Sequence, residues 1–342
     1  MAEITQELHW GIIGAARIAE NAILPALIKS PYAKPHAIAS RNTARAKELA
    51  SKFHIAKIYD SYDALLEDDD IDVVYIALPN NLHVEWMEKA IKANKHILCE
   101  KPAAMNYRSL EALKNDKIHL KISEAFMVRQ QPRWIRLQEI LASKIYGEVK
   151  TFSSLLSFMM SDDPDFRQDP KMGGGAYFDL GCYTAMAARF VFQKEPLRVM
   201  ALMEKNAAGI DLFSTVILDF GDGCHASFLV SLASASSQSI QIVCEKAFIN
   251  LPQAYVPSRQ LPNLIQIDTS TDHANSKLEI IEFPALDQYE AEVTAFSQAV
   301  LGHDVPFYGL DDALANARIG DAIFKSANSG QWVNCNSFND KL

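Results

Sequence analysis

Short apolar runs alternate with amphipathic segments over the first third of the chain. Continuous apolar runs predict buried strands, and apolar positions spaced three to four residues apart predict helices. The predicted strands are residues 9–13, 35–40, 58–59, 72–79 and 96–99. The predicted helices are residues 17–29, 42–53, 61–67 and 82–93. This βαβ rhythm predicts a parallel, doubly wound sheet with right-handed crossovers.

The pattern changes after about residue 125, where strands begin to dominate. The predicted strands of this part are residues 148–158, 197–205, 212–220, 224–233 and 239–245. The sequence FGDGC, which starts at Phe220, predicts a hairpin because Asp-Gly stands between two of these strands. Helices are predicted at residues 133–143, 287–302 and 310–328. Runs of strands with few helices between them indicate a mostly antiparallel sheet with helices on one side.

The length of the chain indicates how many domains these patterns form. A chain of 342 residues is too long for one typical hydrophobic core, so we expect two domains. We place the boundary where the pattern changes, between residues 1–124 and 125–342. The predicted fold is α/β: an N-terminal doubly wound parallel sheet, followed by an α+β domain with a large, mostly antiparallel open sheet.

The net charge and the cysteines indicate which partners and which compartment to expect. A net charge of −9 and a pI of about 5.5 disfavour binding to nucleic acid or to an acidic membrane. Membrane helices need about 18 consecutive apolar residues, and this chain has no such run. The five cysteines are odd in number and form no CxxC pair, which argues against a disulfide framework or a metal site. With no basic signal-peptide start, we expect a cytoplasmic protein in a reducing compartment.

The segment GAARIA, which begins at Gly14, follows the first predicted strand and opens the first helix. Dinucleotide-binding turns carry G-x-G-x-x-G at this place, so that backbone amides and the helix N-terminus hold a pyrophosphate. Here Ala16 and Ala19 replace the second and third glycines. An ordinary strand–turn–helix corner would give the same pattern. The residues predicted to lie against a pyrophosphate are Gly14, Ala16, Arg17 and Ile18.

The end of the second predicted strand indicates which cofactor binds. NAD-dependent enzymes usually place a carboxylate there, against the ribose 2′-hydroxyl. This chain has Ser40 and Arg41 at that position, with Arg45 one helical turn later. A hydroxyl and guanidinium groups suit a 2′-phosphate, so the sequence predicts NADP rather than NAD. The alternative is an arginine that is merely solvated at the start of a helix.

Three further motifs carry a family resemblance. PNNLH (79–83), CEKP (99–102) and GGGAYFDLGCY (173–183) closely resemble motifs of the Gfo/Idh/MocA oxidoreductase family. SEAFMVRQQP (123–132) and PDFRQDPKMGGG (164–175) resemble one branch of it. That branch contains glucose–fructose oxidoreductase, D-xylose dehydrogenase and dimeric dihydrodiol dehydrogenase. The resemblance extends over nearly the whole chain, with the motifs in the same order and at similar separations.

The resemblance implies an N-terminal Rossmann domain, a C-terminal α+β domain and an active site in the cleft between them. It also implies that the open face of the second sheet mediates association, so we expect a homodimer or a dimer of dimers. The family's loop near the nicotinamide ribose matches Leu78, Pro79, Asn80 and His83. Glu100 is expected to contact a cofactor ribose or to position Lys101.

The resemblance also assigns catalytic roles. Lys101, in Glu-Lys-Pro, is expected to hydrogen-bond the reacting oxygen and to lower the pKa of a partner acid. Tyr183 stands where inositol-dehydrogenase-like members carry histidine, and it is expected to relay the proton. Asp179 lies four residues earlier, which on a helix places both side chains on one face. Asp179 is expected to contact the substrate or to orient the acid.

Each assignment has a structural alternative. Lys101 would then be a surface lysine at the end of a strand, and Tyr183 a core residue of an apolar helix. Asp179 would be a helix cap, because a carboxylate is favourable near a helix N-terminus. His83 opens a predicted helix and would cap it.

Several other residues have weaker assignments. Arg129 and Arg167 match arginines of the related branch, where they would contact substrate or cofactor, and surface salt bridges are the alternative. Cys99 and Cys182 flank the predicted site, and we interpret both as packing residues. No His, Asp or Glu cluster has the sequence spacing of a metal site, so we expect hydride transfer without a metal.

Together these observations predict an NADP(H)-dependent oxidoreductase. Its expected substrate is a sugar-like polyol, an aldose or a cyclic diol. One alternative is a non-catalytic NADP-binding regulator of the same fold. Another is a glycosidase that uses a nicotinamide cofactor for transient oxidation.

Overall fold

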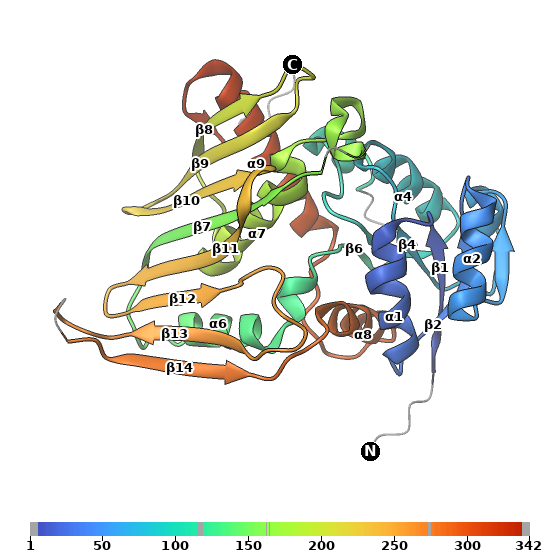
Figure 1. Ribbon diagram of the computed structural model, residues 1–342, viewed down its shortest axis with the longest axis horizontal. Coiled ribbons are helices and arrows are strands. Elements are labelled where there is room, and N and C mark those ends of the chain that lie inside the picture. The colour runs from blue at the N-terminus through green and yellow to red at the C-terminus, as the bar shows by residue number, and fades with distance from the viewer. Residues whose placement is uncertain (1–5, 115–118, 162, 164, 273–274, 337–342) are drawn as a thin grey trace. The chain divides into compact units, whose positions relative to one another are not determined.

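The computed structural model describes residues 6–114, 119–161, 163, 165–272 and 275–336, and its helices and strands are labelled in Figure 1. The chain forms two compact units. Unit 1 comprises residues 1–130 and 287–314, and unit 2 comprises residues 131–286 and 315–342. Within the described residues, no helix is both long enough and apolar enough to cross a lipid bilayer.

The apolar runs of the first third form a six-stranded parallel sheet in the order β3-β2-β1-β4-β5-β6. Its strands are β1 (Leu8–Ile13), β2 (Ala33–Ala39), β3 (Lys57–Tyr59), β4 (Val73–Ile76), β5 (His96–Cys99) and β6 (Ile122–Glu124). This order is that of a doubly wound dinucleotide-binding sheet, so the predicted fold of the N-terminal part is confirmed. Strand β4 is shorter than predicted because the chain leaves the sheet after Ile76. Strand β6 was not predicted.

The helices of unit 1 flank this sheet, and most lie where the apolar period predicts them. They are α1 (Leu24–Lys29), α2 (Thr43–Phe53), α3 (Tyr62–Leu66), α4 (His83–Lys92), α5 (Tyr107–Glu111) and α8 (Gln288–Val300), with short 3₁₀ turns η2 (Asn80–Leu82) and η3 (Met127–Gln130). The helix predicted at 17–29 differs from expectation, since its middle is a π-helix, η1 (Ala19–Ile23). Single π-turns of this kind are frequent at functional sites.

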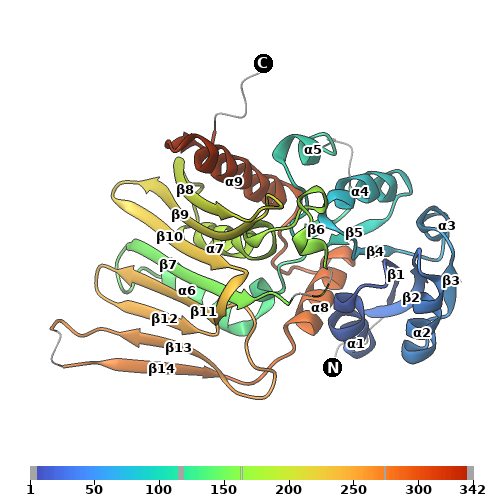
Figure 2. The same ribbon diagram turned by 45° about the horizontal axis from the view of Figure 1, so that its top comes forward.

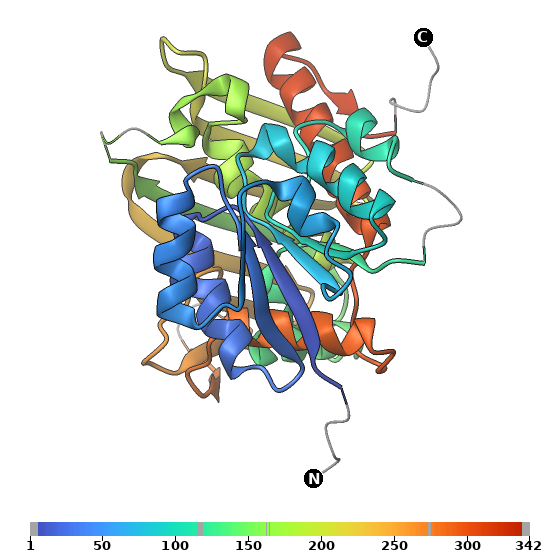
Figure 3. The same cartoon turned by 90° about the vertical axis from the view of Figure 1, so that its right-hand side faces the viewer.

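Helix α8 belongs to unit 1, although it lies between the two segments of unit 2 in the sequence. Val293 and Phe296 are buried in the same apolar cluster as Trp10, and the rings of Phe296 and Trp10 meet edge to face at 5.6 Å. Figure 3 shows α8, in orange, against the blue strands of unit 1. The predicted boundary at 124/125 differs from this division, because residues 287–314 return to complete the first core.

Unit 2 contains a nine-stranded sheet in the order β14-β13-β12-β11-β7-β10-β9-β8-β15. Its strands are β7 (Val149–Met159), β8 (Arg198–Lys205), β9 (Asp211–Gly221), β10 (Cys224–Ser231), β11 (Ala233–Cys244), β12 (Phe248–Pro252), β13 (Asn263–Asp268), β14 (Leu278–Phe283) and β15 (Val333–Asn334). Strands β7 and β10 pair in parallel and the other neighbours are antiparallel, which confirms the predicted mostly antiparallel sheet. The predicted hairpin joins β9 and β10, with positive φ at Asp222 and Gly223.

The helical segments of unit 2 include the one that carries the glycine-rich motif. They are α6 (Pro132–Ala142), α7 (Cys182–Phe192), α9 (Leu310–Ser329), the 3₁₀ turns η4 (Phe166–Gln168) and η5 (Pro170–Met172), and the π-helix η6 (Tyr177–Gly181). Helix α9 begins in unit 1 and continues in unit 2. Figure 2 shows α6 and α7 on the same face of the large sheet, where they pack against β13 and β7. This agrees with the predicted placement of helices on one side.

Candidate active site

Four of the parallel strands in unit 1 end at the same level. Ile13 of β1 pairs with Ala39 of β2 and with Ile76 of β4, and Ile76 pairs with Cys99 of β5. The residues that follow these ends are Gly14, Ser40, Ala77 and Glu100. The carboxyl edge of a parallel sheet is where open α/β folds bind ligands, so the register gathers the predicted cofactor residues there.

The turn after β1 requires glycine at its first position. Gly14 has φ of +104°, and a Cβ atom there would lie 2.5 Å from the carbonyl oxygen of Ala77. The amide of Gly14 donates to the carbonyl of Ala39 at 2.9 Å, which fixes the turn against β2. Ala16 and Arg17 follow at the start of the helical segment and are not buried. The backbone thus offers the glycine cradle and helix N-terminus that a pyrophosphate needs.

The end of β2 offers polar groups of the predicted kind. Ser40 is buried and its hydroxyl accepts a hydrogen bond from the amide of Asn42 at 3.1 Å, while Arg41 is exposed. Arg45 differs from the expectation, because its guanidinium pairs with Glu20 of η1 and with Glu48, the latter at 2.6 Å. The Arg45 guanidinium is therefore already paired with two carboxylates of the protein. The contact of Arg45 with cofactor stays a prediction.

His83 begins helix α4 and is fully buried. Its Nδ1 lies 2.8 Å from the carbonyl oxygen of Pro102, and its Nε2 lies 2.8 Å from that of Leu78. Burial lowers the pKa of His83, although both carbonyls favour the charged form. His83 therefore joins the loop after β4, which includes Pro79 and Asn80, to the Glu-Lys-Pro turn. A direct contact of His83 with the cofactor stays a prediction.

Glu100 and Lys101 follow β5 directly. The Tyr75 hydroxyl donates to Glu100 Oε1, and the amide of Lys101 donates to Glu100 Oε2 at 3.3 Å. Burial, and then the charge of Glu100, raise the pKa of Tyr75 well above its usual range. The peptide bond between Lys101 and Pro102 is cis. Sequence reasoning missed Tyr75, although a hydroxyl within an otherwise apolar strand was a signal that it has a polar partner.

In unit 2, Asp179 lies within the π-helix η6 and is 7% exposed. Its carboxylate Oδ2 accepts a hydrogen bond from Arg167 Nε at 2.8 Å. The amide of Tyr177, at the start of this helix, donates to Asp211 of β9 at 2.8 Å. Asp211 thus takes the capping role that was the structural alternative for Asp179. The predicted catalytic role of Asp179 remains a prediction.

Tyr183 lies in the first turn of α7, four residues after Asp179, as predicted. Its side chain is 7% exposed, and its ring meets the edge of Tyr255 at a centroid distance of 6.0 Å. The Tyr255 hydroxyl is itself 2.6 Å from the hydroxyl of Ser154. Burial raises the pKa of Tyr255, so this neighbour is a neutral phenol. Lys101 belongs to unit 1, whereas Asp179 and Tyr183 belong to unit 2.

The two arginines of weaker assignment have partners within their own units. Arg129 is buried, pairs with Asp312 and lies over the ring of Tyr308, with 4.2 Å from its guanidinium carbon to the ring centroid. Arg167 binds Asp179, as described above. Cys99 and Cys182 are buried, and the five cysteines, all of which lie among the described residues, form no disulfide. These observations agree with the interpretation of both cysteines as packing residues.

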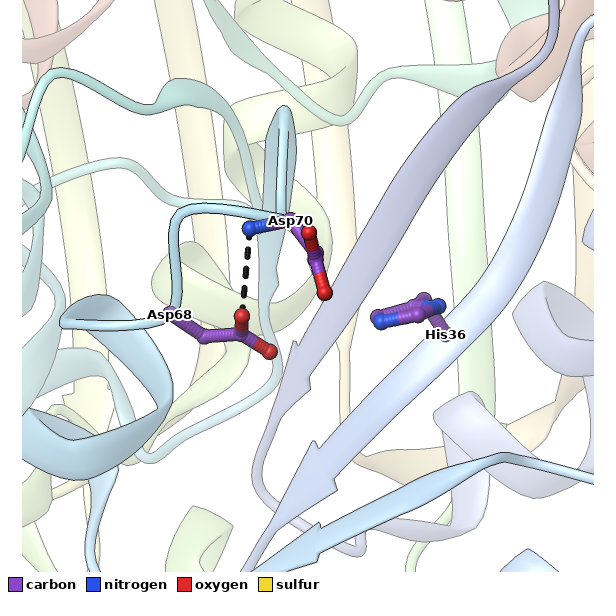
Figure 4. A group of neighbouring side chains, drawn as sticks. All are labelled: His36, Asp68 and Asp70. Carbon is purple, nitrogen blue, oxygen red and sulfur yellow. Dashed lines mark hydrogen bonds between the residues drawn. The ribbon is translucent and has the colours of Figure 1, made fainter.

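One cluster of metal-ligating side chain types lies elsewhere in unit 1. His36 of β2, Asp68 and Asp70 each place a ligand-type atom within 4.8 Å of the others (Figure 4). The spacing in the sequence did not reveal this cluster. The ammonium of Lys57 lies 2.9 Å from an Asp68 oxygen and 2.7 Å from Asp70 Oδ2, so a cation of the protein already pairs with both carboxylates. Asp70 precedes β4 and Lys57 begins β3, which places the cluster at the amino ends of the strands.

Comparison with known proteins covers both units. Residues 8–117 match a family model described as an oxidoreductase family with an NAD-binding Rossmann fold. Residues 134–250 match a model described as the GFO/IDH/MocA C-terminal domain.

Individual relatives match over nearly their whole length. The chain is 35% identical to an uncharacterized oxidoreductase of Rhizobium meliloti, over 95% of this chain and 98% of the relative. It is 32% identical to D-xylose 1-dehydrogenase (NADP(+)) 2 of Haloferax volcanii, over 95% and 99%. Among solved structures, a 3-ketoreductase from Actinomadura kijaniata in complex with NADP and TDP-benzene has a TM-score of 0.86 and 29% identity. That match covers 94% of this chain and 98% of the ketoreductase.

Proposed function

The chain belongs to the Gfo/Idh/MocA oxidoreductase family, and we propose that it reduces or oxidises a sugar-like substrate with Lys101 and Tyr183 as its proton relay. It is a nicotinamide-dependent enzyme, and its cofactor is NADP(H). The observation that carries the proposal is the alignment of strand ends in unit 1. That alignment puts the glycine turn, Ser40 and Glu-Lys-Pro at one edge of the sheet.

The residues at this edge suit NADP(H). The backbone amides after Gly14 would hold the pyrophosphate. Glycine is required at this turn because a Cβ atom would collide with the Ala77 carbonyl. Ser40 and Arg41 would hold the 2′-phosphate through a hydroxyl and an exposed guanidinium. When bound, the nicotinamide accepts or supplies a hydride, and the protein is left to move one proton.

In this proposal, Tyr183 donates or accepts that proton. A tyrosine hydroxyl has an ordinary pKa of about 10, too high for efficient proton transfer at neutral pH. The ammonium of Lys101 would stabilise the phenolate and hydrogen-bond the reacting oxygen. Asp179 would orient the substrate hydroxyls or the phenol. These three groups provide the proton donor, the charge and the orienting carboxylate that a carbinol–carbonyl conversion requires.

The proposed substrates are polyols, aldoses and cyclic diols. The names of two relatives support this range, because one is a dehydrogenase of xylose, which is an aldose, and the other is a reductase of a ketone. A panel of sugars, polyols and diones, assayed in parallel with NADP(H) and NAD(H), would identify the substrate class.

We also propose that the protein is a homodimer, and sedimentation analysis at micromolar concentration would test this.

The decisive test is the variant Lys101→Ala. We expect kcat to fall by roughly 10²- to 10⁴-fold, since that is the usual contribution of general acid–base groups. Binding of NADPH, measured by fluorescence, should largely survive. The matched control is Lys92→Ala, at a lysine whose side chain is 71% exposed in the same unit. Unchanged turnover in Lys101→Ala would refute the assignment.

Other outcomes would favour the alternatives. Tight NADPH binding without turnover of any carbonyl in the panel would favour a non-catalytic regulator. Turnover of glycosides without added cofactor would favour a nicotinamide-dependent glycosidase.

A further inference from the structure

We propose that Arg167 is a positioning residue, which fixes the Asp179 carboxylate in its working orientation. The inference rests on the proposed function, because it gives Asp179 a role at the reacting substrate. The direct contact with substrate or cofactor that the family resemblance suggests for Arg167 is not needed for this role. Arg167 acts through Asp179.

The side chain of Arg167 is held between two carboxylates. Its Nε donates to Asp179 Oδ2 at 2.8 Å, while its NH1 donates to the two oxygens of Asp165 at 3.1 and 3.2 Å. The guanidinium also lies over the Phe166 ring, 4.8 Å from its centroid. These contacts leave the guanidinium little freedom, so Asp179 faces a fixed donor rather than a mobile one.

The backbone of Arg167 reaches the same helix as its side chain. Its carbonyl accepts from the amide of Gly175 at 3.0 Å, and the carbonyl of Gly175 in turn accepts from the amide of Asp179 at 3.1 Å. A Cβ at Gly174 would collide with the Arg167 carbonyl, so the loop closes this tightly only with glycine there. Arg167 therefore attaches to the start of η6 at two points, one through its backbone and one through its side chain.

Charge explains why Asp179 needs such a partner. Asp179 is 7% exposed, and a carboxylate this deeply buried is costly unless it is paired and hydrogen-bonded. Burial lowers the pKa of Arg167, but the attraction of Asp179 and Asp165 outweighs burial and the net shift is upward. A third carboxylate faces this turn from β9, because Asp211 accepts from the amide of Tyr177. Without Arg167, this region would hold three carboxylates and lose the cation that pairs with two of them.

The arrangement has a consequence for the proposed chemistry. Asp179 precedes Tyr183 by about one helical turn, so its direction decides whether it faces the reacting substrate or relaxes toward solvent. Displacement of a substrate-orienting group by about 1 Å is enough to reduce catalysis by around two orders of magnitude. Arg167 would therefore support kcat more than substrate affinity.

The test is a double-mutant cycle on the full chain with Arg167→Gln, Asp179→Asn and the combined variant. We expect Arg167→Gln to lower kcat by roughly 10- to 100-fold and to change KM much less. Its acidic limb in the pH profile of kcat/KM should move to higher pH, because a carboxylate that has lost its cation takes up a proton more readily. In the Asp179→Asn background, Arg167→Gln should cost little more, since both act through one carboxylate.

Two further variants separate positioning from folding. Arg167→Lys keeps the charge and should restore part of kcat. Arg198→Gln removes an exposed arginine paired with Asp219 in the same unit and should leave kcat unchanged. If Arg167→Gln lowers thermal stability but leaves kcat and the pH profile unmoved, or if its effect is fully additive with Asp179→Asn, the inference is overturned.

The same experiment distinguishes the inference from the proposed function. A large effect of Asp179→Asn without any effect of Arg167→Gln would reject Arg167 and leave the proposed function standing. No effect of either Asp179→Asn or Lys101→Ala would instead reject the proposed catalytic assignment itself.

Discussion

Arg41 is the residue on which the choice between NADP and NAD should depend most. It is exposed at the end of β2, beside the buried hydroxyl of Ser40, and Arg45 one turn later is already engaged by two carboxylates. Arg41 is thus the guanidinium at this strand end with no ion pair among the described residues. A charged hydrogen bond is worth about 1.5–3 kcal/mol, which corresponds to roughly a 10- to 150-fold change in affinity.

The variant Arg41→Asp should therefore weaken NADPH binding by about this factor and leave NADH binding unchanged or improved, because a carboxylate repels a 2′-phosphate and accepts from a 2′-hydroxyl. The measurement is kcat/KM for the two cofactors side by side. Lys47→Asp, on the exposed side of α2, makes the same charge change away from the strand end. An unaltered cofactor ratio in Arg41→Asp would show that other residues hold the 2′-phosphate.

At the scale of single residues, the sequence predicts positions better than partners. Gly14 was predicted from its place after a strand, and the structure leaves no room for a Cβ there. The ion pair of Arg45 could not be predicted, because Glu20 lies 25 positions earlier and meets it through the packing of η1 against α2. The hydrogen bond of Tyr75 was hidden for the same reason, since its partner Glu100 directly follows the neighbouring strand β5.

Helix α8 carries a buried acid whose ionisation opposes folding. Glu292 is 6% exposed and lines a small cavity in unit 1 with Glu124 and Arg129. Burial, and then the charge of Glu100, raise the pKa of Glu292 well above its usual range. The folded protein therefore keeps a proton that the unfolded chain loses above about pH 4.3. The free energy of unfolding consequently falls as pH rises from that value toward the folded pKa.

The variant Glu292→Gln should remove this loss, because glutamine resembles the protonated acid and does not ionise. Its melting temperature should exceed that of the parent at about pH 8, and the difference should vanish near pH 4. Glu290→Gln is the control, since Glu290 lies on the same helix near Lys29 and is partly exposed. An equal effect of both substitutions, or a difference that does not depend on pH, would contradict the prediction.

At the scale of elements, most bounds follow from apolar spacing. Helix α2 and strands β1, β7 and β8 lie within two residues of the predicted ranges. Strands β12, β13 and β14 were missed because five or six residues with alternating polarity give too weak a pattern. The π-turns η1 and η6 could not be predicted either, because their apolar pattern over five residues does not differ from that of an α-helix.

For the molecule as a whole, the stability of unit 1 should depend on a helix from the far end of the chain. Phe296 of α8 is 4% exposed and packs against Trp10 of β1. Phe296→Ala should cost about 3–5 kcal/mol, the usual range for a buried phenylalanine. The measurement is the urea concentration at which NADPH binding is lost. Phe248→Ala, at a phenylalanine 40% exposed in unit 2, should leave that midpoint unchanged.

An equal fall of the urea midpoint in Phe248→Ala, or no change in Phe296→Ala, would show that α8 does not stabilise unit 1.

The sequence predicted the two folds correctly, but it predicted a single boundary between them, at 124/125. Periodicity reports which face of a helix is apolar, and it carries no information on which sheet that face will cover. The apolar pattern therefore could not predict that residues 287–314 belong to unit 1.

This return has a consequence for how the protein is made. The ribosome releases residues 1–130 long before residues 287–314, because residues 131–286 of unit 2 lie between them. At about 5–20 residues per second, the first sheet waits roughly 8 to 30 s for the helix that covers Trp10. During that interval the nascent chain carries an unfinished apolar face. The first unit to begin synthesis is thus completed only after residues 131–286 of the second unit have been made.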